Sequence, residues 1–257
     1  MIIRKTDSEI AGIAEAGEVV ARCLAMLRSK CRQGVTTAEL DAAAEKFIQS
    51  QGAYPAFKGY RGFPSSICAS PNSMVVHGIP DDYERARGDI LSIDVGVERE
   101  GWVADAAITV PIRPVSSAAT RLLRATREGL ERGVEQCHVG MRLGDISHAV
   151  QETVEAAGFS VIRSLVGHGI GREMHEDPQI PNFGEPGKGP VLDEGMVFCI
   201  EPMVCIGRHA VRMGDDNWAI YSEDGSLTAH FEHTVAVTSE GPRILTPWHL
   251  IEQKAAA

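Results

Sequence analysis

Two aspartates interrupt apolar sequence in the first half of the chain, and their spacing suggests that they could act together as a pair. Asp94 and Asp105 lie 11 residues apart (105 − 94 = 11), on either side of the polar segment Glu98-Arg99-Glu100-Gly101. Two strands joined by this segment would form a hairpin that places both side chains on one face. Neighbouring buried carboxylates repel each other, and a divalent cation compensates that repulsion. The alternative is a pair of solvent-facing acids on an edge strand.

The second half of the chain offers further candidate ligands. His168 stands in Gly167-His168-Gly169-Ile170-Gly171, where glycines allow close backbone approach, and His175 follows seven residues later (175 − 168 = 7). Glu201 ends one apolar run and Glu232 lies within another. Acids are disfavoured in buried strands, so each of these glutamates requires a partner. The alternatives are structural or surface histidines and glutamates that form salt bridges with arginine.

An oxygen-rich ligand set with a single imidazole follows from these residues. Its members are Asp94, Asp105, His168, Glu201 and Glu232. Such a set suits Mn, Fe, Co or Zn, whereas a soft thiolate site would require cysteine. Bridging carboxylates can hold two cations about 3.5–4 Å apart, and such a pair activates water and polarises a carbonyl. The pattern therefore indicates hydrolysis of an amide.

The elements that would position these residues can be expected from periodicity and capping signals. A capping box in Thr6-Asp7-Ser8-Glu9 predicts a helix whose apolar residues span 10–27, with Gly34 at its stop, and a second box at 36–39 predicts a helix that ends before Gly52. Further helices are predicted at 116–136 and 143–157, strands at 89–97, 102–110, 196–205, 217–221 and 227–238, and a Pro/Gly loop at 178–190. This order predicts one mixed domain with a central, largely antiparallel sheet.

Composition restricts the class of protein. The 257 residues are 44% hydrophobic, which is enough for one sizeable core, and the net charge of −10 argues against a broad basic face for nucleic acid. No apolar run of about 18 residues predicts a membrane span, and the N-terminus lacks the order of a secretion signal. Six cysteines form no CxxC pair, which indicates reduced thiols in a cytoplasmic protein.

Five short segments together resemble bacterial type I methionine aminopeptidases, and the resemblance covers nearly the whole chain. They are Val76-His77-Gly78-Ile79-Pro80, Ile93-Asp94-Val95-Gly96, Gly167-His168-Gly169-Ile170-Gly171, Ile200-Glu201-Pro202-Met203 and Phe231-Glu232-His233-Thr234. The resemblance implies an α+β, pita-bread fold, in which two pseudo-two-fold symmetric halves covered by helices surround a curved, mostly antiparallel sheet. It also implies a single catalytic metallopeptidase domain over residues 1–257. The implied activity is co-translational removal of the initiator methionine, with a small second residue preferred.

The resemblance also implies a role for each site residue. Asp105 and Glu232 would bridge two divalent cations (Co, Mn, Fe(II), Zn or Ni), Asp94 would chelate one cation, and His168 with Glu201 would complete the other. Glu201 would also shuttle a proton. The catalytic pair His77 and His175 would contact the scissile amide and stabilise charge on the tetrahedral intermediate. The methionine pocket would be built by Tyr60, Phe63, Cys68, Met174 and Trp218.

The partners implied by the resemblance are N-terminal methionyl peptides and nascent chains at the ribosome surface. The protein is expected to be a cytoplasmic monomer that binds no specific nucleic acid and no membrane. Some residues depart from the family's usual pattern, namely Arg61, Val76, Ala106, Glu173 and Met174. None of them removes a predicted metal ligand. The departures concern the shape of the pocket and the range of substrates.

Three alternatives have recognisable sequence signatures. Proline-type peptidases of the same fold usually carry a large N-terminal domain, whereas 93 residues precede Asp94 and already read as part of the catalytic domain. Type II methionine enzymes carry a helical insertion, for which the intervals between His168, Glu201 and Glu232 leave no room. A non-catalytic binding module typically loses metal ligands, and all five are present here.

Overall fold

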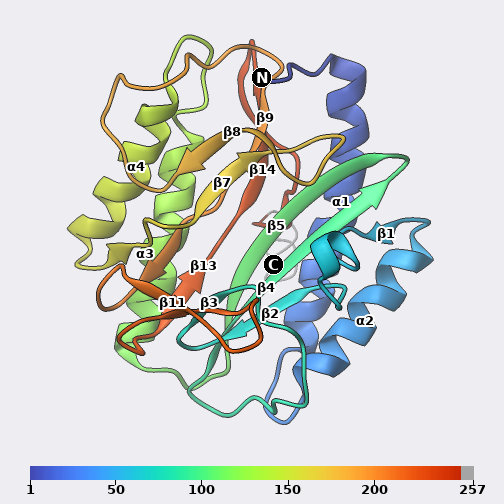
Figure 1. Ribbon diagram of the computed structural model, residues 1–257, viewed down its shortest axis with the longest axis vertical. Coiled ribbons are helices and arrows are strands. Elements are labelled where there is room, and N and C mark those ends of the chain that lie inside the picture. Colours follow the sequence, from blue (N-terminus) through green and yellow to red (C-terminus); the bar gives the residue numbers. More distant parts are fainter. Residues whose placement is uncertain (250–257) are drawn as a thin grey trace.

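Two similar halves, each with a pair of helices followed by antiparallel strands, make up the computed structural model, which describes residues 1–249 (Figure 1). The last eight residues of the predicted domain, 250–257, lie outside the described residues. The first half contains α1 (Asp7–Lys30), α2 (Thr37–Ser50), β1 (Tyr54–Pro55), the 3₁₀ turn η1 (Tyr60–Gly62), β2 (Cys68–Pro71), β3 (Met74–Val76), β4 (Ile90–Arg99) and β5 (Trp102–Pro111).

The second half begins with the helix pair α3 (Ser117–Val134) and α4 (Leu143–Ala156). Its strands are β6 (Ser160–Val161), β7 (Val166–Gly169), β8 (Glu176–Pro181), β9 (Val197–Ile200), β10 (Met203–Cys205), β11 (Val211–Met213), β12 (Ile220–Ser222), β13 (Thr228–His230), β14 (His233–Thr238) and β15 (Gly241–Ile244). Helices and strands therefore mix in the α+β manner that the sequence predicts. None of the described helices combines the length and the apolar composition needed to cross a membrane.

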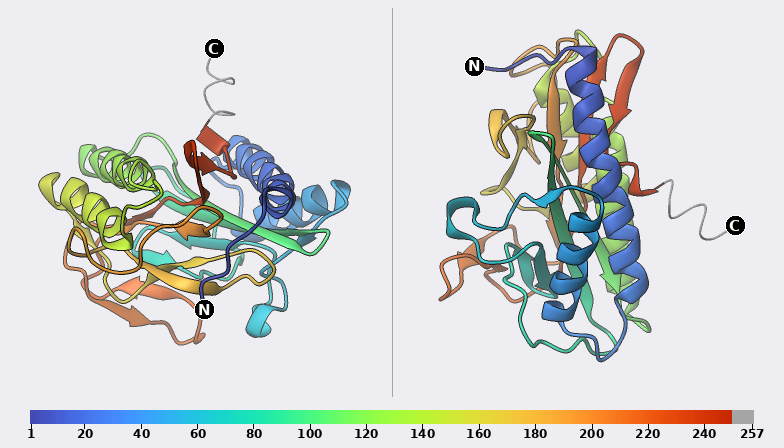
Figure 2. Two further views of the ribbon diagram at one scale, coloured as in Figure 1. Left: turned by 90° about the horizontal axis from the view of Figure 1, so that it is seen from above. Right: turned by 90° about the vertical axis from the view of Figure 1, so that its right-hand side faces the viewer.

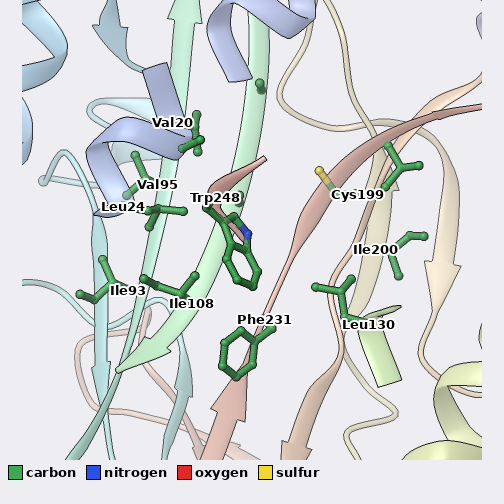
Figure 3. Packing of buried hydrophobic residues seen from close by; sticks show 14 of the residues in the cluster. Val20, Leu24, Ile93, Val95, Ile108, Leu130, Cys199, Ile200, Phe231 and Trp248 are labelled. Carbon is green, nitrogen blue, oxygen red and sulfur yellow. The ribbon is translucent and has the colours of Figure 1, made fainter. Parts of the chain in front are cut away.

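The helix pairs flank the strands, with α1 and α2 over one half and α3 and α4 over the other (Figure 2). Helix α1 packs against β4 and β5, and α3 packs against β9, β10 and β13. Figure 3 shows Val20 and Leu24 of α1 beside Ile93 and Val95 of β4, within the buried core. The apolar face of β4 is thus covered by a helix, which leaves its other face for the polar side chains.

Both predicted capping boxes are present. The Thr6 backbone N–H donates to Glu9 Oε2 at 2.8 Å, and the Thr36 backbone N–H donates to Glu39 Oε2 at 2.7 Å. The expected stop at Gly34 is wrong, because α1 ends several residues earlier and Gly34, with φ of 81°, lies in the turn that follows. The helices thus begin where their side-chain caps satisfy the first backbone donors.

The β4–β5 hairpin confirms the predicted strand pair. Asp94 is opposite Ala107 and Asp105 is opposite Gly96 in the antiparallel register, so both aspartates project from one face at diagonal positions. Strand β4 also pairs with β1 and β2. The reading of Asp94 and Asp105 as solvent-facing acids on an edge strand is wrong, because Asp105 is only 4% exposed and Asp94 is largely covered.

The predicted strands of the second half are interrupted at the two glutamates. The run 196–205 divides into β9 and β10 around Glu201, and the run 227–238 divides into β13 and β14 around Glu232. Pro202, which follows Glu201, has no N–H for a strand ladder. Both acids therefore lie between strands, and the expectation that they are carried within strands is wrong.

Strands β7 and β8 are absent from the sequence prediction, which gave no strand for the glycine-rich residues 167–171 and a Pro/Gly loop for 178–190. They pair with each other, and β7 also pairs with β9. A Cβ on Gly167 would lie 2.3 Å from the backbone oxygen of Cys199. Glycine at this position therefore serves close strand packing, which brings His168 next to the end of β9.

The two halves meet where β5 contacts residues 230–234, and two threonine hydroxyls hold this contact, which we name the threonine seam. Thr234 Oγ1 donates to Asp105 O at 2.8 Å and accepts from Asp105 N at 3.1 Å. Thr109 Oγ1 donates to His230 O at 2.8 Å and accepts from His230 N at 2.9 Å. Between them, the Glu232 N–H donates to Ala107 O at 2.9 Å. The seam therefore fixes the backbone of residues from both halves without using their carboxylates.

Replacement of Thr234 by valine tests the seam. Thr234→Val leaves the buried N–H and C=O of Asp105 without their partner, so we expect the free energy of unfolding to fall by about 1–3 kcal/mol. Urea-induced unfolding measures this change. Thr126→Val is the matched control, because the Thr126 hydroxyl is equally buried but bonds only to Leu122 O within α3, and we expect a smaller loss. Equal stability of Thr234→Val and the wild type would contradict the role of the seam.

Candidate active site

A cavity of about 300 Å³ opens at the threonine seam and collects nearly all the predicted site residues. Strands β4 and β5 contribute two aspartates, β7 contributes His168, and the strand breaks contribute two glutamates. The predicted residues that line the cavity are Tyr60, Phe63, Cys68, His77, Asp94, Asp105, His168, His175, Glu201, Trp218 and Glu232. Residues from both halves, more than a hundred positions apart in the sequence, therefore meet in one place.

Buried oxygen atoms without partners mark the acidic end of this cavity. Asp94 Oδ1, Asp105 Oδ1 and Glu232 Oε1 are buried and have no hydrogen-bond partner. Buried charges require compensation, and a shared cation provides it for several carboxylates at once. The donor atoms of Asp105, His168 and Glu232, together with the sulfur of Cys199, all lie within 4.8 Å of one another. The residues present therefore fit a site for divalent cations.

The separation between donors supports the same conclusion. His168 Nε2 lies 3.7 Å from Glu201 Oε1. Two ligand atoms that each lie about 2.1 Å from one cation are separated by about 3–4 Å. A hydrogen bond would require a shorter distance of about 2.7–3.2 Å. This pair is therefore spaced as two ligands of one ion.

Burial and mutual repulsion change the acidity of the cluster. Burial, with the nearby Asp105 and Glu232 charges, raises the pKa of Asp94 well above its usual value. Burial raises the pKa of Asp105 to about 6. It also raises the pKa of Glu201 and of Glu232, to which neighbouring carboxylates add. Without a compensating positive charge, the cluster therefore retains protons to higher pH than free carboxyl groups do.

The pKa of the imidazole in the cluster is shifted in the opposite direction. Burial lowers the pKa of His168 to about 4, so that its ring is neutral near pH 7. Its Nδ1 lies 3.0 Å from the backbone oxygen of Gly169, which suits an Nδ1–H donor. Nε2 then carries the lone pair, which is the tautomer that a metal ligand requires.

Two further histidines face the cavity beside this cluster. The ring of His175 stacks on Tyr60 at 5.3 Å, and Tyr60 Oη lies 2.8 Å from His175 Nδ1. Burial and the neighbouring His168 lower the pKa of His175 to about 3. His77 has φ of 59°, an uncommon backbone conformation for a residue other than glycine, and burial lowers the pKa of its ring. Both rings are therefore neutral hydrogen-bonding groups at the cavity wall.

The apolar end of the cavity contains four of the five predicted pocket residues. Phe63 and Trp218 pack edge to face with ring centroids 5.1 Å apart, and Tyr60 and Cys68 lie in the same wall. Met174 does not line the cavity; it is buried behind the wall, where its Cε would lie 2.8 Å from a Cβ on Gly96. The departure from the family pattern at this residue therefore affects the support of the wall and not its surface.

Two residues near the cluster are missing from the sequence prediction. His230 is 1% exposed and lines the cavity, and the sulfur of Cys199 lies 3.5 Å from Thr234 Oγ1 and within 4.8 Å of a carboxylate oxygen of Glu232. Burial and nearby acids raise the pKa of Cys199, so it is a thiol and not a thiolate. Each of the two precedes a predicted glutamate by two positions. Because alternate residues of a strand lie on one face, this spacing could have predicted that both face the cluster.

The fold and the cavity define a metal-dependent enzyme, because buried acids and an imidazole form one cluster beside a substrate-sized space. Comparison with known proteins shows to which family of metal-dependent enzymes the chain belongs. The sequence profile described as Metallopeptidase family M24 matches residues 11–239, and the chain belongs to this family.

Curated and solved relatives agree with this placement. The methionine aminopeptidase of Clostridium perfringens is 50% identical over 246 residues, which cover 96% of this chain and 99% of the relative. The crystal structure of the methionine aminopeptidase of Thermotoga maritima matches with a TM-score of 0.94 at 45% identity, and covers 96% of this chain and 99% of that one.

A prolidase of Pyrococcus furiosus shares the architecture at a TM-score of 0.78 and 25% identity. The match covers 95% of this chain and 65% of that enzyme. These neighbours confirm the predicted pita-bread fold. The part of that prolidase which the match does not cover agrees with the expectation that proline-type peptidases carry an additional domain.

Removal of divalent cations should destabilise the protein, and more strongly as the pH rises. The raised pKa of Asp105, about 6, means that its contribution to the stability of the metal-free protein is lost as the pH rises through that value. Cations at 100 times their Kd stabilise the fold by about 2.7 kcal/mol. We therefore expect the difference in Tm between Mn²⁺-loaded and chelated protein to be larger at pH 7.5 than at pH 5.5. Asp105→Asn should reduce this pH dependence. A Tm difference between loaded and chelated wild-type protein that is the same at both pH values would contradict the prediction.

Proposed function

We propose that this chain removes the initiator methionine from newly made proteins, as a methionine aminopeptidase that uses two divalent cations. The observation that carries the proposal is the convergence of the carboxylate–imidazole cluster and an apolar pocket in one cavity. The relatives from Clostridium perfringens and Thermotoga maritima, matched over nearly the whole of both chains, are named methionine aminopeptidases. The activity, hydrolysis of the first peptide bond, follows from the chemistry of the two ends of this cavity.

The cluster divides between two cation positions in this proposal. Asp105 and Glu232 would hold both cations, Asp94 would complete the ligands of one cation, and His168 with Glu201 would complete those of the other. The partnerless oxygens of Asp94, Asp105 and Glu232 support this division, because each has a lone pair that no protein donor satisfies. When bound, the cations activate water and polarise the scissile carbonyl.

Proton transfer is assigned to Glu201. Burial and the charges of Asp94 and Asp105 raise its pKa, so that without a cation this carboxyl holds a proton more readily than a free glutamate does. In the proposed reaction, Glu201 takes a proton from the attacking water and gives it to the leaving amine. His77 and His175 donate hydrogen bonds to the scissile amide and stabilise the charge that develops on its oxygen.

Selection of the first residue is assigned to the apolar end of the cavity. The crossed rings of Phe63 and Trp218 and the side chains of Tyr60 and Cys68 offer apolar contact to an unbranched side chain such as that of methionine. Such contacts discriminate by about 1–3 kcal/mol per methylene. The free α-amine of the substrate would bind at the cation end of the cavity through its lone pair, which explains why only the first residue is released. A small second residue is preferred because a bulky one meets the cavity wall.

The cellular setting of the proposal is the cytoplasm, where the chain acts as a monomer, in a single catalytic domain of residues 1–257, on nascent chains at the ribosome surface. All six cysteines are free and buried, which suits a reducing compartment. The large exposed apolar side chains of the described residues come from separate segments and include Met1, Tyr54, Val139 and Met213. Their scatter supports a monomer.

Release of free methionine from the peptide Met-Ala-Ser tests the activity. We expect turnover after chelated protein is supplied with Mn, Co, Zn or Fe(II), and none with the N-acetylated peptide, because the acetyl group removes the free amine. An Ala-Pro dipeptide should be left intact, in contrast to the expectation for a prolidase. Absence of methionine release with all four metals would favour a non-catalytic binding module.

A ligand variant provides the control for this assay. Asp105→Ala removes both oxygens proposed to bridge the cations, so kcat/KM should fall by more than the 10–100-fold typical of residues that only support a ligand. Circular dichroism and the unfolding temperature must show that the variant is folded. Wild-type turnover in a folded Asp105→Ala protein would overturn the assignment of the bridging carboxylate.

A further inference from the structure

Among the four histidines that line the cavity, His230 alone has no role in the proposed function, although its environment is unusual. The side chain is 2% exposed, and neither Nδ1 nor Nε2 has a hydrogen-bond partner. Buried imidazole nitrogens are normally satisfied, and an unsatisfied one requires an explanation such as an ion. Its backbone is fixed at both polar groups by Thr109 Oγ1 in the threonine seam. The ring is therefore held in place by its backbone, while its nitrogens remain available.

The distances from this ring to the acidic cluster suit a shared cation. His230 Nε2 lies 3.6 Å from Glu201 Oε2 and 3.9 Å from Glu232 Oε2. Both distances exceed the 2.7–3.2 Å of a typical hydrogen bond to oxygen. Both lie within the separation of about 3–4 Å expected for two ligands that each stand about 2.1 Å from one ion. Nε2 is thus spaced from two proposed ligands as a third ligand would be.

The position of His168 completes the argument. Its Nε2 approaches Glu201 Oε1, whereas His230 Nε2 approaches Glu201 Oε2, so the two oxygens of one carboxylate each face a different imidazole. We propose that His230 Nε2 is an additional metal ligand, and that the cation held by Glu201 and Glu232 is coordinated by two imidazoles, His168 and His230. This inference rests on the proposed function in that cations bind at the cluster.

A second nitrogen ligand changes which metals the site prefers. Imidazole suits Zn, Co, Ni and Fe, whereas carboxylate-rich sites suit Mn and Mg. The cation between Glu201 and Glu232 should therefore bind Co²⁺ or Zn²⁺ in preference to Mn²⁺. The other cation position, completed by Asp94, has oxygen ligands only and should discriminate less. His230→Gln should reduce this difference, because it replaces a ring nitrogen by an amide.

The test is proton NMR of the full-length protein loaded with Co²⁺, which is paramagnetic and strongly shifts the N–H protons of coordinated imidazoles. We expect two strongly shifted, exchangeable imidazole signals in the wild type and one in His230→Phe. Isothermal titration with Co²⁺ should show at least a tenfold weaker affinity at one site of His230→Phe. His77→Ala is the matched control, because it removes another cavity imidazole and should keep both signals and both affinities.

The outcomes distinguish this inference from the proposed function. A single shifted signal in the wild type, or unchanged Co²⁺ affinities in His230→Phe, would overturn the ligand role of His230 while leaving the peptidase proposal intact. No Co²⁺ binding to the wild type would overturn both. If His230→Phe does not fold, the signal count in the wild type and the affinities of His230→Gln still decide the question.

Discussion

The mutual repulsion of four acids in one buried cavity is the constraint on which the rest of the structure depends. Burial raises the pKa of each of these acids, and the charges of neighbouring carboxylates raise those of Asp94, Glu201 and Glu232 further. The threonine seam opposes this repulsion without using the carboxylates, since the hydroxyls of Thr109 and Thr234 bond to main-chain groups of His230 and Asp105. The carboxylate oxygens thus remain available, and a cation is the remaining partner that can satisfy them.

Local signals in the sequence were enough to predict the elements that carry the first two ligands. Alternation of apolar and polar residues and one short polar turn defined the β4–β5 hairpin, whose register places Asp94 and Asp105 on one face. Reciprocal side-chain caps defined the starts of α1 and α2. Both signals act within a few residues, so tertiary contacts do not override them. The meeting of these aspartates with His168, Glu201 and Glu232 had no such local signal: residue types alone suggested one ligand set, and a family resemblance supplied the role of each member.

The errors in the sequence prediction come from contacts between distant segments. The breaks at Glu201 and Glu232 divide apolar runs that look continuous, and the second break exists because the Glu232 N–H bonds across the seam to Ala107. Strand β7 is rich in glycine, which reads as a turn, yet Gly167 is required by the approach of the Cys199 backbone. The position of Met174 behind the cavity wall likewise follows from packing against Gly96. Such features are properties of the assembled halves.

The two halves contribute different chemistry to the site. The hairpin of the first half supplies oxygen only, through Asp94 and Asp105, whereas the second half supplies both imidazoles and both glutamates. The two cation positions would therefore differ in their ligands, and the one with imidazole ligands is the position beside Glu201. A carboxylate flanked by His168 and His230 has little room to rotate, because each of its oxygens faces a ring. The same enclosure that fits Glu201 to hold a cation would keep its oxygens aligned for proton transfer, so ligation and catalysis place the same demand on this side chain.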